Sequence, residues 1–277
     1  MKIDLSPMHP GNKQDLLSFI ELIVKDLPEE EFLKCKFETF LPYLPSIEDS
    51  DEMSKEAITM LADCFKEKGV QSEPRISRGY VKRAIESPIY IYKCSNDFDH
   101  TADNYRKALL QLRMSVVMAL SDNEVAEEEL ASIKTMLWSI AYLSRPEKMA
   151  LWVKAQYLVL SNHEIDERLR DYRKKLISQQ SFIETFEELE RPLALKLLTV
   201  AKDIAISDGY IEKGEVWILR KMYKALDLPT RSVEKDLTEH AKQNHVYLKN
   251  NNEEYETTTN IDDDEAMDLL GDILLDF

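Results

Sequence analysis

The sequence predicts an all-α protein, a helical bundle built from two repeated hairpins, each made of a helix, an acidic turn and a second helix. Three observations predict this fold. Apolar residues recur at helical spacing along most of the 277 residues. A segment with an acidic turn occurs twice at a fixed separation. Only six glycines occur, and the turns between the helices lack the Gly/Pro clusters that punctuate β proteins.

Residues 1–100 are expected to form an additional, mainly helical region. Apolar residues lie on one face of a predicted helix over 16–27. A proline suited to a first helical turn follows, ahead of apolar residues at helical spacing over 32–41. A third helix is expected within 50–68. The stretch Ile89-Tyr90-Ile91-Tyr92 is typical of a strand, but it is too short to found a sheet.

The next region, residues 101–243, contains the internal repeat. The acidic turn at 121–129 (SDNEVAEEE) aligns without gaps with 207–215 (SDGYIEKGE), so that Asp122 corresponds to Asp208, 86 positions later. Apolar residues on both sides of the turn stay in register at the same offset. Two such hairpins can bury their apolar stripes against each other. We expect the two halves to pair around a pseudo-two-fold axis.

These residues resemble a known family. The stretch AISDGYI at 205–211, followed by Glu215, is similar to the motif of the TerB (tellurite-resistance B) domain, and the likeness covers residues 102–243. The first copy departs from the motif, with Asn123 in place of glycine and Val125 in place of isoleucine. The resemblance implies an all-α bundle that gathers the acidic residues of both turns. It also implies a place in bacterial stress response, including tellurite resistance, or in antiviral defence, with a metal-binding or signalling role and no catalytic mechanism.

Two interpretations of the acidic turns remain open. In the first, the following helices begin near Ala126 and Glu212, so that a glutamate at the third helical position accepts a hydrogen bond from the N–H of the capping residue. Asn123 and Gly209 then supply the left-handed backbone that ends the preceding helices. In the second, the two turns hold Ca²⁺ or Mg²⁺, which prefer several carboxylate oxygens. The four candidate metal ligands are Asp122, Glu129, Asp208 and Glu215.

Composition narrows the classes of partner and compartment. The net charge of −16 argues against nucleic acid or an anionic membrane as a direct partner. The few glycines provide no loop that could cradle a phosphate. No apolar run approaches membrane-spanning length, so we expect no membrane insertion and a cytoplasmic location. The three cysteines, Cys35, Cys64 and Cys94, form no CxxC motif and are expected to be reduced thiols.

The acidic residues are concentrated at the end of the sequence. Residues 250–277 include ten acidic side chains and no basic one. Residues 244–261 are expected to form a flexible linker, and 262–277 an acidic amphipathic helix. This helix either docks into a hydrophobic groove of a partner or packs on the body of its own chain. The residues predicted to bind the partner are Leu270, Ile273, Leu274 and Phe277.

Together these patterns predict a non-enzymatic adaptor or sensor subunit of a bacterial stress-response or phage-defence system. It would bind other proteins of that system, with an ATPase or helicase as a candidate partner, through its helical body and acidic tail. One alternative is a regulatory module that binds Ca²⁺ or Mg²⁺ through the two acidic turns. Another is an enzyme with an unrecognised site, although no nucleophile has an evident activating partner in the sequence.

Overall fold

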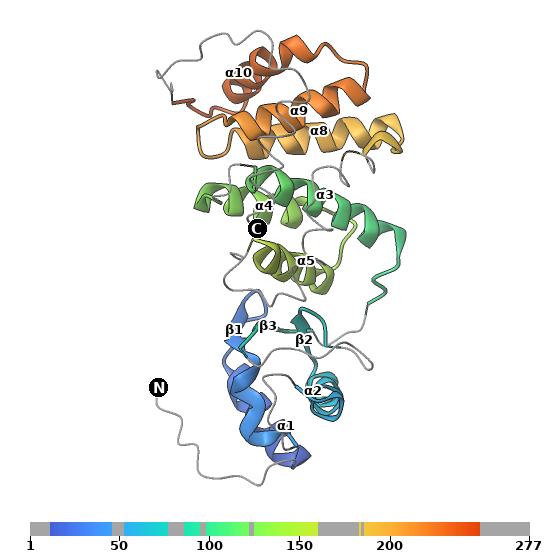
Figure 1. The fold of residues 1–277 in the computed structure, drawn as a ribbon, viewed down its shortest axis with the longest axis vertical. Helices are drawn as coiled ribbons and strands as arrows, with labels where there is room; N and C mark the ends of the chain where they lie inside the picture. Colours follow the sequence, from blue (N-terminus) through green and yellow to red (C-terminus); the bar gives the residue numbers. More distant parts are fainter. Residues whose placement is uncertain are drawn as a thin grey trace.

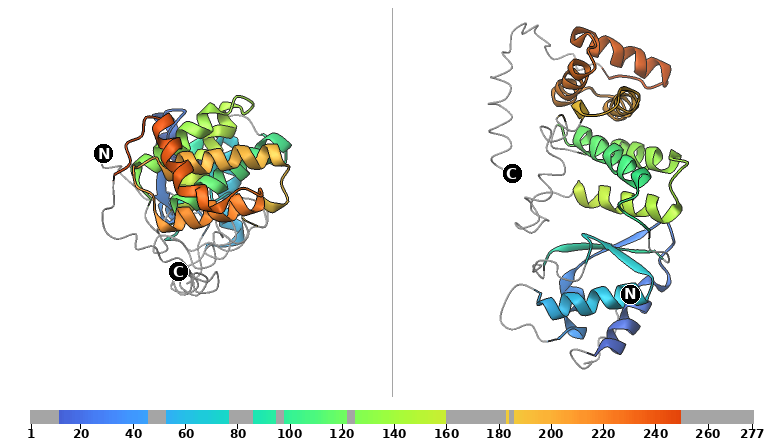
Figure 2. Two further views of the ribbon diagram at one scale, coloured as in Figure 1. Left: turned by 90° about the horizontal axis from the view of Figure 1, so that it is seen from above. Right: turned by 90° about the vertical axis from the view of Figure 1, so that its right-hand side faces the viewer.

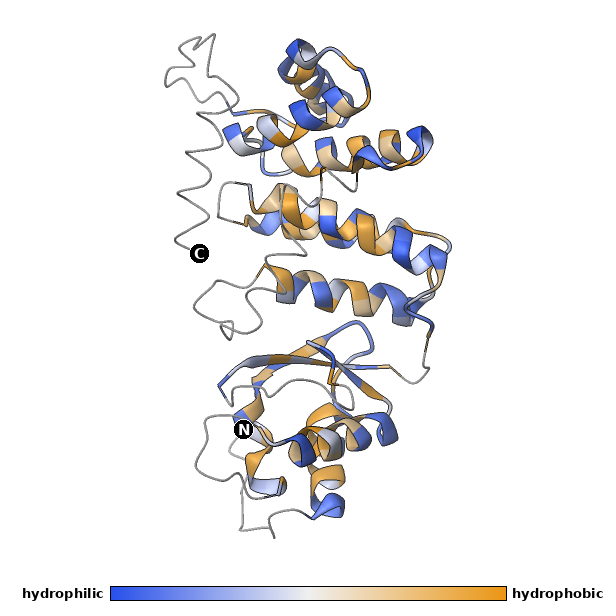
Figure 3. Cartoon of the chain, turned by 45° about the vertical axis from the view of Figure 1, so that its right-hand side comes forward, coloured by the Kyte–Doolittle hydropathy of each residue, from blue (hydrophilic) through white to orange (hydrophobic). Residues whose placement is uncertain are grey.

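The computed structural model describes residues 12–45, 53–76, 86–94, 98–121, 125–159, 183 and 186–249. These residues form an N-terminal part and a helical part, which follow one another along the long axis of the molecule (Figure 1). Figure 3 shows that apolar and hydrophilic residues alternate along the helices of both parts. None of the described helices is long and apolar enough to cross a lipid bilayer.

The N-terminal part packs helices on one face of a small antiparallel sheet. Its helices are α1 (Lys13–Lys25), the 3-10 helix η1 (Phe37–Tyr43) and α2 (Lys55–Glu67). Its strands are β1 (Phe32–Lys36), β2 (Val70–Glu73) and β3 (Pro88–Lys93), in the spatial order β1-β3-β2. The central strand pairs antiparallel on both sides, and Ile91 lies opposite Leu33 of β1 and Ser72 of β2. Ser54 begins α2, because its side chain accepts the N–H of Ala57.

The prediction of an all-α fold is wrong, because the N-terminal part contains this sheet. Residues 32–36 were expected to lie in a helix, yet they form β1, since the few apolar side chains there fit a helical and an extended spacing alike. Strand β3 is short, as expected. It nevertheless founds a sheet because both of its edges are paired and helices cover both of its faces.

Strand β3 separates two hydrophobic cores. Ile89 and Ile91 belong to the N-terminal core with residues of α1, η1 and α2, whereas Tyr90 and Tyr92 belong to the core of the helical part. This division follows from the alternation of side chains along a strand. The ring of Tyr90 meets that of Tyr157 in α5 (Arg145–Leu158) edge-on, with centroids 6.5 Å apart. The sheet therefore lies between the two hydrophobic cores and contributes side chains to both.

A buried ion pair joins α5 to the sheet. The Lys154 Nζ of α5 lies 2.7 Å from Glu73 Oε1 of β2, and the two side chains are only 13% and 6% exposed. Nearby, the hydroxyl of Tyr92 donates to Gln71 Oε1 at 3.1 Å. Burial first, and the Glu73 carboxylate second, hold the pKa of Tyr92 well above its usual value.

The described residues of the helical part include two sets of three α-helices in the same order. The first set is α3 (Asp103–Ala119), α4 (Glu127–Ser139) and α5, and the second is α8 (Arg191–Ala205), α9 (Lys213–Ala225) and α10 (Val233–Gln243). Shifted by 86 positions, the bounds of α4 coincide with those of α9. The two hairpins expected from the repeat are thus present as α3–α4 and α8–α9, and each copy includes a third helix.

The two sets pack against each other reciprocally. Helices α3 and α8 make the most extensive contact between the sets, α4 contacts α8, and α9 contacts α3. This exchange of partners is the pattern of a pseudo-two-fold axis between α3 and α8. Figure 2 shows the first set layered between the sheet and the second set.

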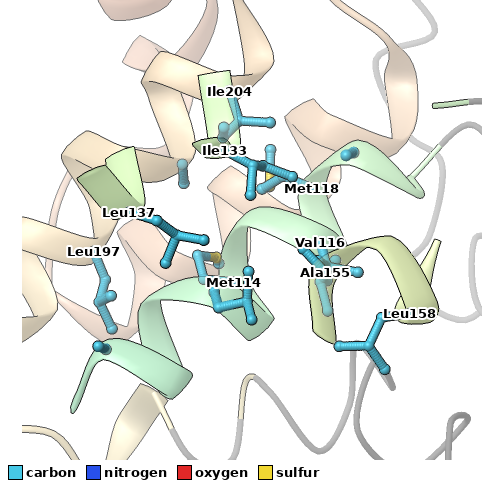
Figure 4. Packing of buried hydrophobic residues seen from close by; sticks show 14 of the residues in the cluster. Met114, Val116, Met118, Ile133, Leu137, Ala155, Leu158, Leu197 and Ile204 are labelled. Carbon is cyan, nitrogen blue, oxygen red and sulfur yellow. The ribbon is translucent and has the colours of Figure 1, made fainter. Parts of the chain in front are cut away.

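The core between these helices is filled by side chains from α3, α4, α5 and α8. Met114 and Met118 of α3 lie among the buried side chains of the other three helices (Figure 4). Ile133 of α4 lies toward Ile204 of α8, and Leu137 lies toward Leu197, so these two helices run antiparallel (Figure 4). Each fully buried aliphatic side chain of this kind contributes roughly 1.5–3 kcal/mol.

Candidate functional site

The second acidic turn, between α8 and α9, is held by bonds to its own backbone. Gly209 has a left-handed φ of 86°, which favours glycine. Asp208 Oδ1 accepts the N–H of Tyr210 at 2.8 Å and closes an Asx turn. Glu215 Oε2 accepts the N–H of Glu212, the residue that precedes α9, at 2.8 Å. The interpretation of this turn as a helix cap predicted the last of these bonds.

The first acidic turn is described from Val125 onward. Glu129 Oε2 accepts the N–H of Ala126 at 2.8 Å, as Glu215 does for Glu212. Ala126 has no side-chain oxygen, so the glutamate makes the only side-chain bond of this cap. Both glutamates are buried, and a buried carboxylate is costly unless it is hydrogen-bonded. The cap bond therefore stabilises the carboxylate and the helix end together.

The structure does not gather the four predicted metal ligands into one group of described residues. Asp122 lies outside the described residues. Glu129, Asp208 and Glu215 each use a carboxylate oxygen in a backbone hydrogen bond. Within the described ranges, no three or more His, Cys, Asp or Glu side chains are placed to hold a metal ion. Binding of Ca²⁺ or Mg²⁺ stays a prediction. Helix capping accounts for the geometry of Glu129 and Glu215, and the Asx turn accounts for that of Asp208.

Replacing Glu215 tests the capping interpretation. We expect Glu215→Ala to lower the free energy of unfolding by about 1 kcal/mol, because the N–H of Glu212 loses its acceptor. Glu215→Gln should retain most of the stability, since an amide oxygen can accept the same bond. Urea unfolding of the two variants measures the difference. A melting temperature that Ca²⁺ raises in the wild type and leaves unchanged in Glu215→Gln would instead support a cation site.

A groove of about 780 Å³ lies between α4 and α8. Since the two helices are antiparallel, Glu128 and Ser207 lie at one end of the groove, and Tyr142 and Lys196 lie at the other. Apolar side chains from both helices and from the segments that follow them form part of its lining. These are Ala131, Met136, Ile140, Val200, Ile204 and Val246.

Polar groups stand among these apolar side chains. Tyr142 is 42% exposed, and Lys196 Nζ lies 5.9 Å from the centroid of its ring. A hydrogen bond joins Tyr142 to the side chain of Gln111, although burial of the ring still raises the pKa of Tyr142. Asp203 Oδ1 lies 2.7 Å from His240 Nε2. The groove thus offers an aromatic ring, a cation and an amide beside an apolar surface.

The two repeats differ at the positions that line this groove. Ala131 and Ser132 of α4 correspond, 86 positions later, to Trp217 and Ile218 of α9. Ile218 lies in the core and Trp217 packs against it. The second repeat therefore has large apolar side chains at positions where the first repeat has small ones that line the groove. We call the contact of α4 with α8 the open seam and the equivalent contact of α9 with α3 the closed seam.

Gly214 allows close contact between α9 and the residue that follows α3. A Cβ added at Gly214 of α9 would lie 2.3 Å from the carbonyl oxygen of Ser121, which follows α3. The equivalent residue of the first repeat is Glu128, an exposed residue that lines the groove. The absence of a side chain at Gly214 lets the backbone of α9 approach that of Ser121, whereas α4 has an exposed glutamate at the equivalent position.

No known protein family, characterised protein or solved structure matches this chain. The TerB-like assignment is therefore a proposal, carried by the two acidic turns and by the paired repeats that contain them.

The predicted partner-binding residues of the tail, Leu270, Ile273, Leu274 and Phe277, lie outside the described residues. The first six residues of the predicted linker 244–261 are described. Val246 and Leu248 pack against the core of the helical part. The N–H of Lys249 donates to the carbonyl oxygen of Gly209 at 2.8 Å. This segment therefore returns to the second acidic turn.

The predicted site residues did not include the groove. Its most distinctive residues are Gln111, Tyr142 and Lys196, and none of them belongs to a motif. A signal was nevertheless present in the repeat, because buried Gln111 stands where the second copy has Leu197. Comparing the copies for their differences, as well as for their likeness, would have singled out this position.

Proposed function

We propose that this chain is a non-enzymatic adaptor or sensor subunit of a bacterial stress-response or phage-defence system. Its TerB-like pair of repeats docks a segment of a partner protein in the groove between α4 and α8. The observation that carries the proposal is the groove itself, which joins apolar side chains of both repeats with polar groups at its ends. Gly214, by contrast, brings the backbone of α9 close to Ser121 at the equivalent position of the second repeat.

The chemistry of the open seam suits an amphipathic helix. Helix α4 has 13 residues and is therefore about 20 Å long, enough to follow three to four turns of a docked helix. The apolar lining offers contact to one face of such a helix. Tyr142 at one end is a half-exposed aromatic side chain of the type that anchors protein interfaces. Lys196 beside it provides a cation for an acidic residue of the partner.

The environment of reactive groups also supports a non-enzymatic role. Burial raises the pKa of Cys35 to about 12, so that its thiol is protonated and a poor nucleophile near neutral pH. Burial also raises the pKa of Cys64. The carboxylates of Glu129 and Glu215 hold the ends of helices.

The double variant Tyr142→Ser/Lys196→Glu tests the proposal. We expect it to weaken binding of a partner encoded by a neighbouring gene by roughly 30-fold, the effect of losing about 2 kcal/mol at an aromatic anchor. Co-expression with the products of the neighbouring genes, followed by calorimetry on any purified complex, measures the effect.

A matched control is Leu22→Ser on α1, which also removes an exposed apolar side chain, 47% exposed, but far along the chain from the groove. Equal binding by the groove variant and the wild type would contradict the proposal, as would the absence of any complex with the neighbouring gene products.

A further inference from the structure

We infer that the partner helix docked in the open seam carries opposite charges toward its two ends, a basic residue that faces Glu128 and Asp203 and an acidic residue that faces Lys196. The inference rests on the proposed function, because it takes the groove to be the place where a segment of a partner docks. It adds the chemistry of that segment, which the apolar lining alone leaves open.

One end of the groove is acidic. Glu128 stands in the first turn of α4 and Asp203 near the end of α8, so the antiparallel helices bring both residues to the same end (Figure 4). Asp203 is 46% exposed and contacts His240 through Oδ1. Glu128 is exposed and forms no ion pair with another described residue. The nearby Lys249 does not line the groove, and its Nζ lies 4.3 Å from the centroid of the Tyr210 ring.

The other end of the groove is cationic. Lys196 lies in the second turn of α8, seven positions before Asp203. This separation is about two helical turns, or roughly 10 Å along the axis, and it places both residues on one side of α8. Lys196 is exposed, and its Nζ lies 5.9 Å from the centroid of the Tyr142 ring. Of the described residues that line the groove, it is the only one with a lysine or arginine side chain.

The middle of the groove offers no charge. The Thr135 hydroxyl of α4 donates to the carbonyl oxygen of Ala131 at 2.9 Å, and the Ser139 hydroxyl donates to that of Met136 at 2.7 Å. These hydroxyls therefore donate within their own helix, and apolar side chains form much of the remaining lining. The charges at the two ends are what can distinguish one amphipathic segment from another.

The helix dipoles leave this distribution of charge unchanged. Helix α4 begins and α8 ends at the acidic end, so the partial positive charge of one terminus offsets the partial negative charge of the other. A segment with acidic residues toward both ends would place a carboxylate beside Glu128 and Asp203. A segment with basic residues toward both ends would place a cation beside Lys196. Like charges in contact weaken binding, so a segment of mixed charge fits best.

Three synthetic peptides test the inference on the full chain. Each is an amphipathic helix of about 14 residues, close to α4 in length, with blocked termini and the same apolar face. They differ only at two positions about two turns apart, which hold Lys and Glu, two Glu, or two Lys. In fluorescence anisotropy at low salt, we expect the mixed peptide to bind about 10-fold more tightly than either of the others. The difference should shrink as the salt concentration rises.

Reversing the charge at each end of the groove gives a pair of opposing variants. Glu128→Lys should shift the preference toward the peptide with two Glu, and Lys196→Glu should shift it toward the peptide with two Lys, each by about 10-fold. General damage to the fold would weaken all three peptides alike. As a matched control, Glu127→Lys makes the same change at an exposed neighbour that does not line the groove, and it should alter each affinity by less than about two-fold.

Equal affinities of the three peptides would overturn the inference, as would a preference that Glu128→Lys and Lys196→Glu leave unchanged. Failure of all three peptides to bind would also overturn it. The proposed function is tested separately by partner binding of Tyr142→Ser/Lys196→Glu. If that variant loses the partner while the peptides show no preference, the proposed function stands without the inference. If the peptides show the expected preference but no complex forms with the neighbouring gene products, the inference about the groove stands without the adaptor role.

Discussion

Lys154→Met is expected to lower the free energy of unfolding by about 3–5 kcal/mol, the cost of removing one partner of a buried ion pair. The substitution keeps an apolar side chain of similar length on α5 but leaves the Glu73 carboxylate, 6% exposed, without its ammonium partner 2.7 Å away. Chemical denaturation at neutral pH measures the loss. In the double variant Glu73→Gln/Lys154→Met no charge is buried, and much of the stability should return.

The exposed pair of Arg220 and Glu234 provides the control. Arg220→Met should change stability by no more than about 1 kcal/mol, because solvent screens an exposed ion pair. Equal losses for Arg220→Met and Lys154→Met would show that the buried pair has no special part in joining α5 to the sheet.

Gly214→Ala is expected to destabilise the protein by about 1–3 kcal/mol, the usual cost of overpacking. The expected sign is informative, because alanine in a helix is ordinarily about 1 kcal/mol more favourable than glycine. At Gly214 the new Cβ would lie 2.3 Å from the carbonyl oxygen of Ser121, so the closed seam must separate. Thermal unfolding of the variant measures the effect.

The equivalent position of the first repeat gives a matched control. Glu128 is exposed at the rim of the groove, and Glu128→Ala should leave the melting temperature nearly unchanged. A gain in stability for Gly214→Ala would mean that α9 can move away from Ser121 at little cost, and it would contradict the tight packing at this position.

The sequence was informative where structure depends on local patterns. The offset that aligns Asp122 with Asp208 also aligns the bounds of α4 with those of α9, because apolar residues at helical spacing define each helix from its own residues. The cap bonds of Glu129 and Glu215 were predictable for the same reason, since each joins residues three positions apart.

The sheet could not be predicted in this way. Pairing of β1 with β3 brings together Leu33 and Ile91, which lie far apart in the sequence. The strand character of residues 89–92 was evident, but the partners on both edges and the helices on both faces were not. The groove was missed for a related reason, because it depends on differences between two repeats that become neighbours only in the folded chain.

The closed and open seams of the duplicated architecture differ in how they are packed. Gly214 lies against Ser121 where the second repeat meets the first, and its counterpart Glu128 is exposed at the groove. Residues such as Ala131 and Tyr142 can then change through evolution at little cost to folding. The surface of the groove can therefore diverge in sequence while the close packing of Gly214 on Ser121 is kept.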